Sequence, residues 1–502
     1  MLLVQASVRS GVHVAGRQSS ISTTPVRRPK SLHSKPRDTL DRCGDCYSPM
    51  YGRGWIRVGP LCWVSGISGR RVSAVSSGKE RSNAPAPNAG SRVAPEFAEE
   101  AIKYFIKRLE GRGWDRAREW VPESLGREGA GSGRMQGVWR AMDVVYGLGL
   151  RETPLIKSPW LQESVLRGIS GGGEQGKMPR ETAGSVLLKM ESEQVTGSFK
   201  ARGAAFKIMS LSQKERGNGV LVSSTGNHAL AVMHAVAALN KAVGEEIVLE
   251  MYLPETIASR KLSKIEREAS KCGARVHLVG KDCVEAEVAA REAAERTGRV
   301  YISPYNDMTV IAGQGTIAME ILMERGPGEI DAVFVPVGGG GLIAGIGTVL
   351  KAISPGVKVF GCQPEKSDVM KRSIEAGSVV SIPWHETLSE GTAGGLEDHA
   401  VTLDECKAVV DHWVTVSEEE IAAAMVGVHG HHGTQIEGAA AVGVAGLMKC
   451  APKVAGKHSI VIICGGNVSS ETLDKAYDIV RGGYSGKSGE PDGPVRGEAA
   501  SF

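Results

Sequence analysis

Residues 331–353 read DAVFVPVGGGGLIAGIGTVLKAI, and this stretch decides the fold. An apolar, β-branched run leads directly into four glycines. Beyond the glycines, apolar residues recur at helical spacing: Leu342, Ile346, Val349, Leu350 and Ile353. The pattern predicts a buried strand, a loop and a helix, and the backbone N–H groups of such a loop converge on an anion at the positive helix end. We therefore interpret the loop as a phosphate cradle formed by Gly338, Gly339, Gly340 and Gly341.

The loop differs from two common nucleotide-binding loops. It is not a Walker A loop, because no Gly-Lys-Ser or Gly-Lys-Thr closes it. A nicotinamide-binding loop is a closer match, since Gly339, Gly341 and Ala344 fit G-x-G-x-x-A. Glu365 also follows the next predicted strand, where a ribose-binding acid is expected. Four consecutive glycines exceed what such a turn needs, so a nicotinamide-binding protein stays as an alternative.

Short apolar runs alternate with helical segments on both sides of this stretch. The predicted strands span residues 186–190, 219–224, 247–254, 274–280, 332–338, 357–362 and 459–466, and helices are predicted at 96–110 and 138–148. Continuous apolar strands separated by helices indicate parallel sheets covered on both faces, which is an α/β fold. Because single cores stop growing at roughly 250–300 residues, about 385 residues of this pattern predict two domains.

The first 94 residues differ in charge from the rest. They carry 15 Lys and Arg against 4 Asp and Glu, a net charge of +11, whereas the whole 502-residue chain has +4, which leaves −7 for residues 95–502. Arg and Ser recur and no acid precedes Asp38, a composition typical of an organelle transit peptide, with a basic nucleic-acid or membrane arm as the alternative. No apolar run approaches the roughly 20 residues that span a bilayer. We therefore expect a soluble protein of the mitochondrion or plastid.

Lys200 lies in an unusual position for a solvated cation. Residues 193–205 read EQVTGSFKARGAA, and a helical pattern follows Ser198, which is a plausible N-cap. Lys200 then falls in the first helical turn, where the helix dipole disfavours a positive charge. A surface side chain that reaches past the helix end is the ordinary explanation.

A second strand-to-helix turn, STGNHALA at residues 224–231, offers convergent donors to a carboxylate. The proposed carboxylate site consists of Ser224, Thr225, Gly226, Asn227 and His228, although the same residues could form only a helix cap. Cys464 follows an apolar strand in VIICGGN, where a cysteine alone is more often an apolar filler. A phosphate cradle, a carboxylate cradle, a lysine in a turn and a thiol together suit pyridoxal 5′-phosphate, with Lys200 as its Schiff-base partner.

Residues 146–480 also resemble the serine/threonine dehydratase and serine racemase branch of the fold-type II pyridoxal-phosphate enzymes. The similar segments occur in the family's order: RETPLIKSPWL (151–161), GSFKARGA (197–204), SSTGNHALA (223–231), GQGTIAMEI (313–321), PVGGGGLIAG (336–345), SEGTAGG (389–395) and CGGN (464–467). The resemblance implies two open, twisted, largely parallel sheets with helices on both faces and an active site between them. We expect a large domain at 95–214 and 311–481, a small inserted domain at 215–310, a transit peptide and disordered linker at 1–94, and a disordered tail at 482–502.

The resemblance also implies roles for individual residues. Lys200 forms the Schiff base and moves the α-proton of the substrate, and Phe199 packs beside the cofactor ring. Asn227 bonds the phenolic oxygen of the cofactor, the four glycines bind its phosphate, and Cys464 faces its pyridine nitrogen. Because a neutral thiol cannot hold that nitrogen protonated as an Asp would, the ring is a weaker electron sink and loss of a β-leaving group is favoured.

Two positions depart from the racemases of this family. Thr225 stands where a racemase has a serine that reprotonates the opposite face, and its extra methyl stiffens χ1. Gln363 and Val369 stand where racemases bind a divalent cation through carboxylates, so we predict no metal there. Glu390 in SEGTAGG lines the active site by resemblance, without an assigned role.

These features predict a lyase that converts L-threonine or L-serine into a 2-oxo acid and ammonia. A serine racemase is the first alternative, and a β-replacement synthase is another, although its usual GSFKDR and TSGNTG loops are replaced here by GSFKAR and STGNHA. The resemblance further implies a homodimer, and too little chain follows residue 480 for a regulatory amino-acid-binding domain. A nucleic-acid partner is not expected, because the folded part is net negative.

Overall fold

The computed structural model describes residues 132–167, 184–244, 246–383 and 385–482. All of them belong to one compact unit that spans residues 87–502. The predicted transit peptide, the predicted helix at 96–110 and residues 483–502 of the predicted tail lie outside the described residues. Among the described residues, no helix combines the length and the apolar character needed to cross a membrane.

Six strands form a mixed, mainly parallel sheet. Its order is β1 (Leu155–Lys157), β2 (Ser185–Lys189), β10 (His458–Ile462), β7 (Ala332–Pro336), β8 (Lys358–Pro364) and β9 (His412–Val416). All neighbours are parallel except β1 and β2, and in the centre Val333 of β7 pairs with Ile460 of β10 and Val359 of β8. The central strands are continuously buried, as the apolar runs in the sequence predict.

Four further strands form a second, entirely parallel sheet in the order β5 (Arg275–Leu278), β4 (Leu249–Leu253), β3 (Val220–Ser223) and β6 (Val300–Tyr301). The predicted α/β fold is confirmed, and each predicted strand has a counterpart. Three strands escaped prediction because they lack a long apolar run: β1 and β6 span three and two residues, and β9 alternates between exposed and buried positions.

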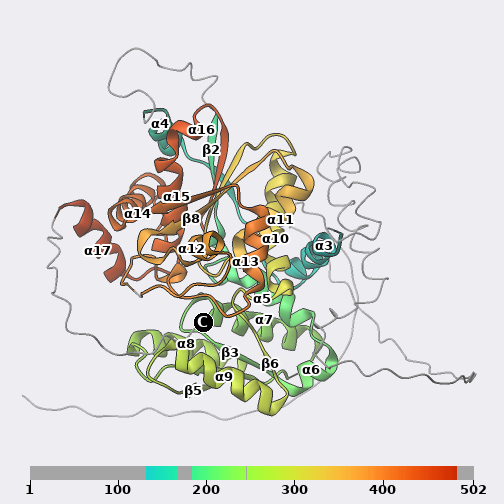
Figure 1. The fold of residues 1–502 in the computed structure, drawn as a ribbon. Helices are drawn as coiled ribbons and strands as arrows, with labels where there is room; N and C mark the ends of the chain where they lie inside the picture. Colours follow the sequence, from blue (N-terminus) through green and yellow to red (C-terminus); the bar gives the residue numbers. More distant parts are fainter. Residues whose placement is uncertain (1–131, 168–183, 245, 384, 483–502) are drawn as a thin grey trace, which may run out of the picture. The chain divides into compact units, whose positions relative to one another are not determined.

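Helices cover both sheets (Figure 1). Around the six-stranded sheet lie α3 (Ser132–Gly147), α4 (Pro159–Arg167), α10 (Met308–Arg325), α11 (Gly341–Ile353), α12 (Val369–Ala376), α13 (Val401–Val409), α14 (Glu418–His432), α15 (Gly438–Lys449), α16 (Ala451–Val454) and α17 (Ser470–Val480). Helix α15 packs across β7 to β10, while α10 and α11 pack together with α3 on the other side. The four-stranded sheet lies with α5 (Lys200–Met209), α6 (Gln213–Asn218), α7 (Asn227–Val243), α8 (Ser259–Cys272) and α9 (Cys283–Thr297).

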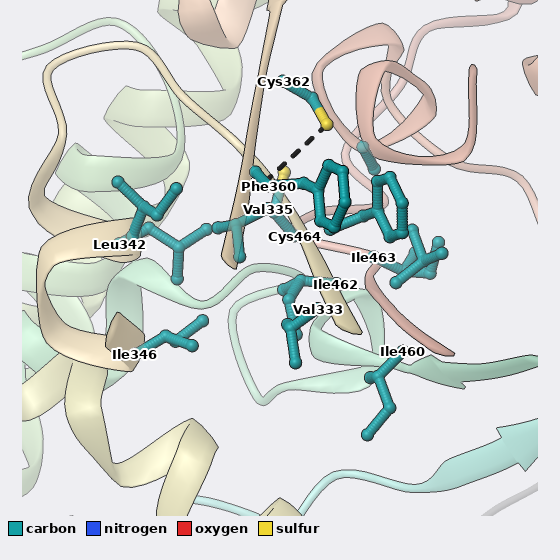
Figure 2. Packing of buried hydrophobic residues seen from close by; sticks show 14 of the residues in the cluster. Val333, Val335, Leu342, Ile346, Phe360, Cys362, Ile460, Ile462, Ile463 and Cys464 are labelled. Atoms are coloured by element: carbon teal, nitrogen blue, oxygen red, sulfur yellow. Dashed lines mark hydrogen bonds between the residues drawn. The ribbon is translucent and has the colours of Figure 1, made fainter. Parts of the chain in front are cut away.

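The core of the larger sheet lies between its central strands and the first turns of α11. Figure 2 shows Val333 and Val335 of β7 beside Phe360 of β8 and Ile460 and Ile462 of β10. From the helix, Leu342 and Ile346 face the same strands, as their predicted helical spacing requires. Each is almost fully buried, so the glycine loop between β7 and α11 is held at both ends by apolar packing.

The helix ends agree with the sequence in some places and not in others. The 138–148 prediction matches α3, and a capping box of Ser417 and Glu420 begins α14. The predicted N-cap Ser198 is wrong, since Phe199 occupies this position of α5 and the Ser198 hydroxyl is buried without a hydrogen-bond partner. Ser198 instead forms an isolated β-bridge with Gly465, so a tertiary contact replaces the cap.

Arg202 lies at the centre of a fully buried ion cluster. Its guanidinium donates to both oxygens of Glu191, at 2.8 Å each, and to both oxygens of Glu320, at 2.6 and 2.9 Å. Lys189 donates to Glu320 at 2.5 Å and to the Thr153 carbonyl at 2.7 Å. Burial alone would raise the pKa of Glu320, but the charges of Arg202 and Lys189 hold it below its usual value. The cluster therefore joins α5, β2 and α10 with every charge paired.

Substitution of Arg202 by Met should destabilise the protein strongly. The variant leaves Glu191 and Glu320 buried with fewer partners, and loss of one member of a buried pair costs about 3–5 kcal/mol. We expect this loss in the free energy of unfolding, measured by urea denaturation followed by circular dichroism. Arg267→Met removes an arginine from the exposed pair with Glu268 and should change the same quantity by less than about 0.5 kcal/mol. Equal effects of the two substitutions would contradict the structural role of the cluster.

Candidate active site

One cavity of about 450 Å³ lies where parallel strands of both sheets reach their carboxyl ends. Its walls come from the loops after β3, β6, β7 and β10 and from the start of α5. All predicted site residues line it: Phe199, Lys200, Ser224, Thr225, Gly226, Asn227, His228, Gly338, Gly339, Gly340, Gly341, Glu390 and Cys464. Motifs separated by more than 260 residues in the sequence are therefore brought together around one space.

Lys200 is the first residue of α5, and its side chain points into the cavity. Its Nζ donates to the Pro304 carbonyl at 2.8 Å and lies 5.1 Å from the centre of the Phe199 ring. Burial lowers the pKa of Lys200 to about 8, although Cys464 and Glu437 act in the opposite direction. A substantial fraction of this amine is therefore neutral near pH 8, as a nucleophile or base requires.

The glycine loop begins α11 without any side-chain cap. Gly340 takes φ +88°, which favours glycine, and a Cβ at Gly339 would lie 2.4 Å from the Tyr305 ring. The Tyr305 hydroxyl accepts a hydrogen bond from the Glu397 main-chain N–H at 2.9 Å, which fixes the ring against the loop. Backbone donors at the positive end of a 13-residue helix thus face the cavity without competing side chains.

The second cradle begins α7, and it too has no side-chain cap. Gly226 is the N-cap residue, and its N–H donates to the Ser224 hydroxyl at 3.2 Å. His228 is buried and donates through Nε2 to the Ile302 carbonyl at 2.8 Å. Burial and the nearby Lys200 lower the pKa of His228 to about 3, so its ring is neutral. His228 therefore contributes no positive charge to the cavity.

Cys464 is buried directly behind the start of α5. Its carbonyl accepts the N–H of Phe199 at 3.0 Å, and burial together with Glu437 raises the pKa of its thiol well above the usual value. The side chain is a neutral thiol at physiological pH. A free thiol of this kind is a weak hydrogen-bond donor and acceptor and not a proton source.

Glu390 and Gln363 have different surroundings. Glu390 begins the short 3₁₀ segment Glu390–Thr392 at the cavity rim, is exposed, and pairs with Lys261 of α8 at 2.9 Å. Gln363 is fully buried, and its amide bonds the backbone of Val337, Ser367 and Lys371. Gln363 therefore supports the chain behind the glycine loop.

Several residues of the cavity wall were missed by sequence reasoning: Pro304, Tyr305, Thr392, Glu437 and Asn467, and Lys261 and Lys264 of α8. Asn467 ends the CGGN motif and could have been found by its place after the strand. Tyr305 and Glu437 carry no local signal, because the contacts that place them involve residues far away in the sequence.

The surroundings of the cavity fit pyridoxal 5′-phosphate. An uncapped helix start behind four glycines suits its phosphate, an amine with a lowered pKa suits its aldehyde, and an amide and a thiol are available for its ring heteroatoms. Because Gly339 has no side chain, the Tyr305 ring packs directly against the loop, where a Cβ would lie 2.4 Å from it. An α/β protein with these groups in one cavity is of the pyridoxal-phosphate enzyme class.

Comparisons with known proteins agree with this class. The sequence profile of the family described as pyridoxal-phosphate dependent enzymes matches residues 148–466. The L-threonine ammonia-lyase of Thermotoga maritima is 42% identical over 294 residues, which are 59% of this chain and 70% of that protein. The processed form of threonine deaminase isoform 2 from Solanum lycopersicum superposes with a TM-score of 0.61 at 31% identity, over 70% of this chain and 90% of that chain. Maize serine racemase gives 0.56 at 27% identity, over 68% and 97%.

The chain belongs to the pyridoxal-phosphate dependent enzyme family, and pyridoxal 5′-phosphate is its cofactor. The resemblance inferred from the sequence motifs is thereby confirmed. The nicotinamide alternative for the glycine loop is wrong for the same reason.

Substitution of Gly339 by Ala should weaken cofactor binding. The new Cβ collides with the Tyr305 ring, so either the ring or the glycine loop has to move. We expect a dissociation constant at least about tenfold higher, equivalent to about 1.4 kcal/mol, in a titration with pyridoxal 5′-phosphate followed by visible absorbance. Gly356→Ala is the matched control, because its Cβ would meet no atom within 4 Å. Unchanged affinity of the Gly339 variant would exclude this loop as the cradle.

Proposed function

We propose that the protein is an ammonia-lyase that converts L-threonine or L-serine into a 2-oxo acid and ammonia. The main support for the proposal is that the Lys200 amine lies in the same cavity as the uncapped N-terminal ends of α7 and α11. The L-threonine ammonia-lyase of Thermotoga maritima and the threonine deaminase of Solanum lycopersicum support it, since their names state this activity and this chain is similar to both.

The starts of α11 and α7 each bind one anionic group. The loop of Gly338 to Gly341 holds the phosphate of the cofactor through backbone N–H groups. The carboxylate of the substrate binds at the start of α7, to Ser224, Thr225, Gly226, Asn227 and His228. Phe199 packs beside the cofactor ring, and Asn227 also offers its amide to the phenolic oxygen. An amino acid bound in this way would present its α-carbon to Lys200.

Lys200 carries the proton transfer. Pyridoxal 5′-phosphate, when bound, withdraws electrons from the α-carbon of an amino acid attached through its amine. Lys200 would hold the cofactor before substrate binds, and its amine, once free, would take the α-proton. The low pKa of this amine, near 8, provides a base that is available at neutral to slightly alkaline pH. The β-hydroxyl would leave as water after gaining a proton, and the unsaturated amine then released would be hydrolysed by water to the 2-oxo acid and ammonia.

Cys464 directs the outcome toward elimination. Its thiol would face the pyridine nitrogen of the bound cofactor, and its raised pKa keeps it neutral. A neutral thiol does not hold a proton on that nitrogen, so negative charge at the α-carbon is poorly stabilised and loss of the β-hydroxyl is the faster course.

Racemisation is the second candidate function. It is supported by the likeness to maize serine racemase and by the Thr225 hydroxyl at the cavity wall, which could return a proton from the face opposite Lys200. The additional methyl group of threonine restricts its rotamers, so this activity is expected to be minor.

Incubation of the full-length protein with L-threonine and L-serine should release 2-oxo acid and ammonia in equal amounts. The D-enantiomers serve as matched substrates, and the formation of D-serine from L-serine measures racemisation. Lys200→Ala should lower the rate about 10²–10⁴-fold or more, because it removes the base. A yellow protein that releases no 2-oxo acid from either L-substrate would contradict the lyase proposal.

Cys464→Asp should shift the balance between proton exchange and elimination. A carboxylate beside the ring nitrogen keeps it protonated, which stabilises charge at the α-carbon and delays departure of the β-hydroxyl. In D₂O, the ratio of α-deuterium incorporation to 2-oxo acid release should rise about tenfold, equivalent to about 1.4 kcal/mol. Cys464→Ser retains a neutral group and should leave the ratio nearly unchanged; a similar rise in both variants would refute this role of the thiol.

We also propose the wider organisation of the protein: its domains, its oligomeric state and its location. Strands β3 to β6 lie between residues 220 and 301, which supports a small domain inserted at 215–310 in a large domain of 95–214 and 311–481. Family likeness supports a homodimer, and the basic, acid-poor start of the chain supports import into a mitochondrion or plastid. Light scattering of the purified protein should give twice the chain mass, and a fluorescent protein fused behind residues 1–94 should enter an organelle.

A further inference from the structure

Two carboxylates line the cavity, and Glu437 is the less exposed of them. Both of its oxygens accept hydrogen bonds from the Asn227 side-chain nitrogen, at 2.9 Å each. Its Oε1 also accepts the main-chain N–H of Asn467 at 2.9 Å. Burial raises the pKa of Glu437, while the donors from Asn227 and Asn467 favour its ionised form. Glu437 is thus an acceptor whose partners are both residues of the cavity wall.

Asn467 holds the other end of the same amide. Its side-chain nitrogen donates to Asn227 Oδ1 at 2.8 Å and to the Thr196 carbonyl at 2.8 Å. An ionised carboxylate can only accept hydrogen bonds, so the Asn227 amide must present its nitrogen to Glu437. If the amide turned over, its oxygen would face the carboxylate and its NH₂ group would face that of Asn467. Both contacts are repulsive, so one orientation of Asn227 is selected.

We propose that Glu437 is a positioning residue that, with Asn467, sets the orientation in which Asn227 meets the cofactor. The inference rests on the proposed bond between Asn227 and the phenolic oxygen. That oxygen accepts hydrogen bonds, so Asn227 must offer an N–H and not its carbonyl. The nitrogen has two hydrogens, and an amide held by Glu437 and Asn467 offers the second to a neighbouring acceptor. A glutamine at position 437 keeps one acceptor, at the place of Oε1, but puts an NH₂ group where Oε2 accepts the Asn227 nitrogen, so two donors then face each other.

The chain is built closely around this carboxylate. Glu437 directly precedes α15, and its N–H donates to the Gly465 carbonyl at 3.1 Å. A Cβ at Gly465 would lie 2.3 Å from Glu437 Oε1, and one at Gly391 would lie 3.5 Å from Oε2. The glycine that follows Cys464 in the CGGN motif is therefore required by a side chain that approaches from another segment.

Glu437→Gln tests the proposal through the cofactor and not through turnover. The full-length protein, freed of cofactor, is titrated with pyridoxal 5′-phosphate while visible absorbance is recorded over a range of pH. We expect a dissociation constant about tenfold higher or more and a displaced pH dependence of the absorbance maximum. In an Asn227→Ala background, Glu437 has no side-chain amide to orient. The same substitution should then change the dissociation constant for pyridoxal 5′-phosphate by less than about twofold. Independent, additive losses in this cycle would overturn the proposal.

Two further variants separate positioning from general stability. Gly465→Ala keeps every polar group but displaces the Glu437 carboxylate, and it should reproduce the spectral change even if Glu437→Gln folds poorly; normal absorbance and affinity in this variant would refute the proposal. Glu418→Gln is the matched control, because Glu418 is a half-buried carboxylate that accepts the Thr387 hydroxyl and the Leu388 N–H away from the cavity wall. It should leave the titration unchanged.

The outcomes also separate this inference from the proposed function. If Glu437→Gln changes the absorbance while no L-substrate yields 2-oxo acid, the positioning role stands and the lyase proposal fails. If Asn227→Ala itself leaves affinity and absorbance unchanged, Asn227 does not bond the cofactor and the role of Glu437 is excluded.

Discussion

The pairing of Arg202 with Glu191 and Glu320 is the constraint on which the geometry of the cavity depends. Arg202 lies two residues after Lys200, so the same helical turn carries the cavity lysine on one side and the buried guanidinium on the other. Glu191 follows β2, and Glu320 lies in α10. Because the planar guanidinium bonds both carboxylates with both of their oxygens, α5 has little freedom to rotate or slide. Apolar residues could supply similar stability, and the cluster is better explained by the position that it imposes on α5.

The segment between β6 and α10 links the position of α5 to the rest of the site. It connects the four-stranded sheet with α10, which packs beside the six-stranded sheet. It also contacts Lys200 at the start of α5 and the glycine loop before α11. The Pro304 carbonyl accepts the Lys200 amine, and the Tyr305 ring fills the space over Gly339. Tyr305 is in turn held by Glu397, whose carboxylate accepts a hydrogen bond from Asn306 at 2.8 Å. A movement of either sheet would therefore displace the Lys200 amine and the glycine loop together.

Sequence patterns predicted the features whose causes are local. Continuous apolar runs gave the central strands, and glycines at strand ends gave the two cradles, because both depend on neighbouring residues. Ser198 failed as an N-cap because a bridge to Gly465, far away in the chain, determines its conformation. Glu437 could not be found in this way, since its partner Asn227 is separated from it by 210 residues and neither stands in a recognisable spacing with the other. Tyr305 was missed for the same reason: its importance comes from a glycine loop more than 30 residues later.

The position of Glu437 clarifies how a site with a carboxylate so close to its thiol can still favour elimination. Gly465, the residue after Cys464, lies against the Glu437 carboxylate. The charge of Glu437 raises the pKa of the Cys464 thiol beyond the effect of burial alone. Asn227 and Asn467 both donate to this carboxylate, so its oxygens are already engaged as hydrogen-bond acceptors. In the proposed chemistry, one negative charge thus orients the amide that meets the phenolic oxygen and keeps the thiol neutral at the ring nitrogen. The neutral thiol leaves the α-carbon charge weakly stabilised, which favours rapid departure of the β-hydroxyl over return of the proton.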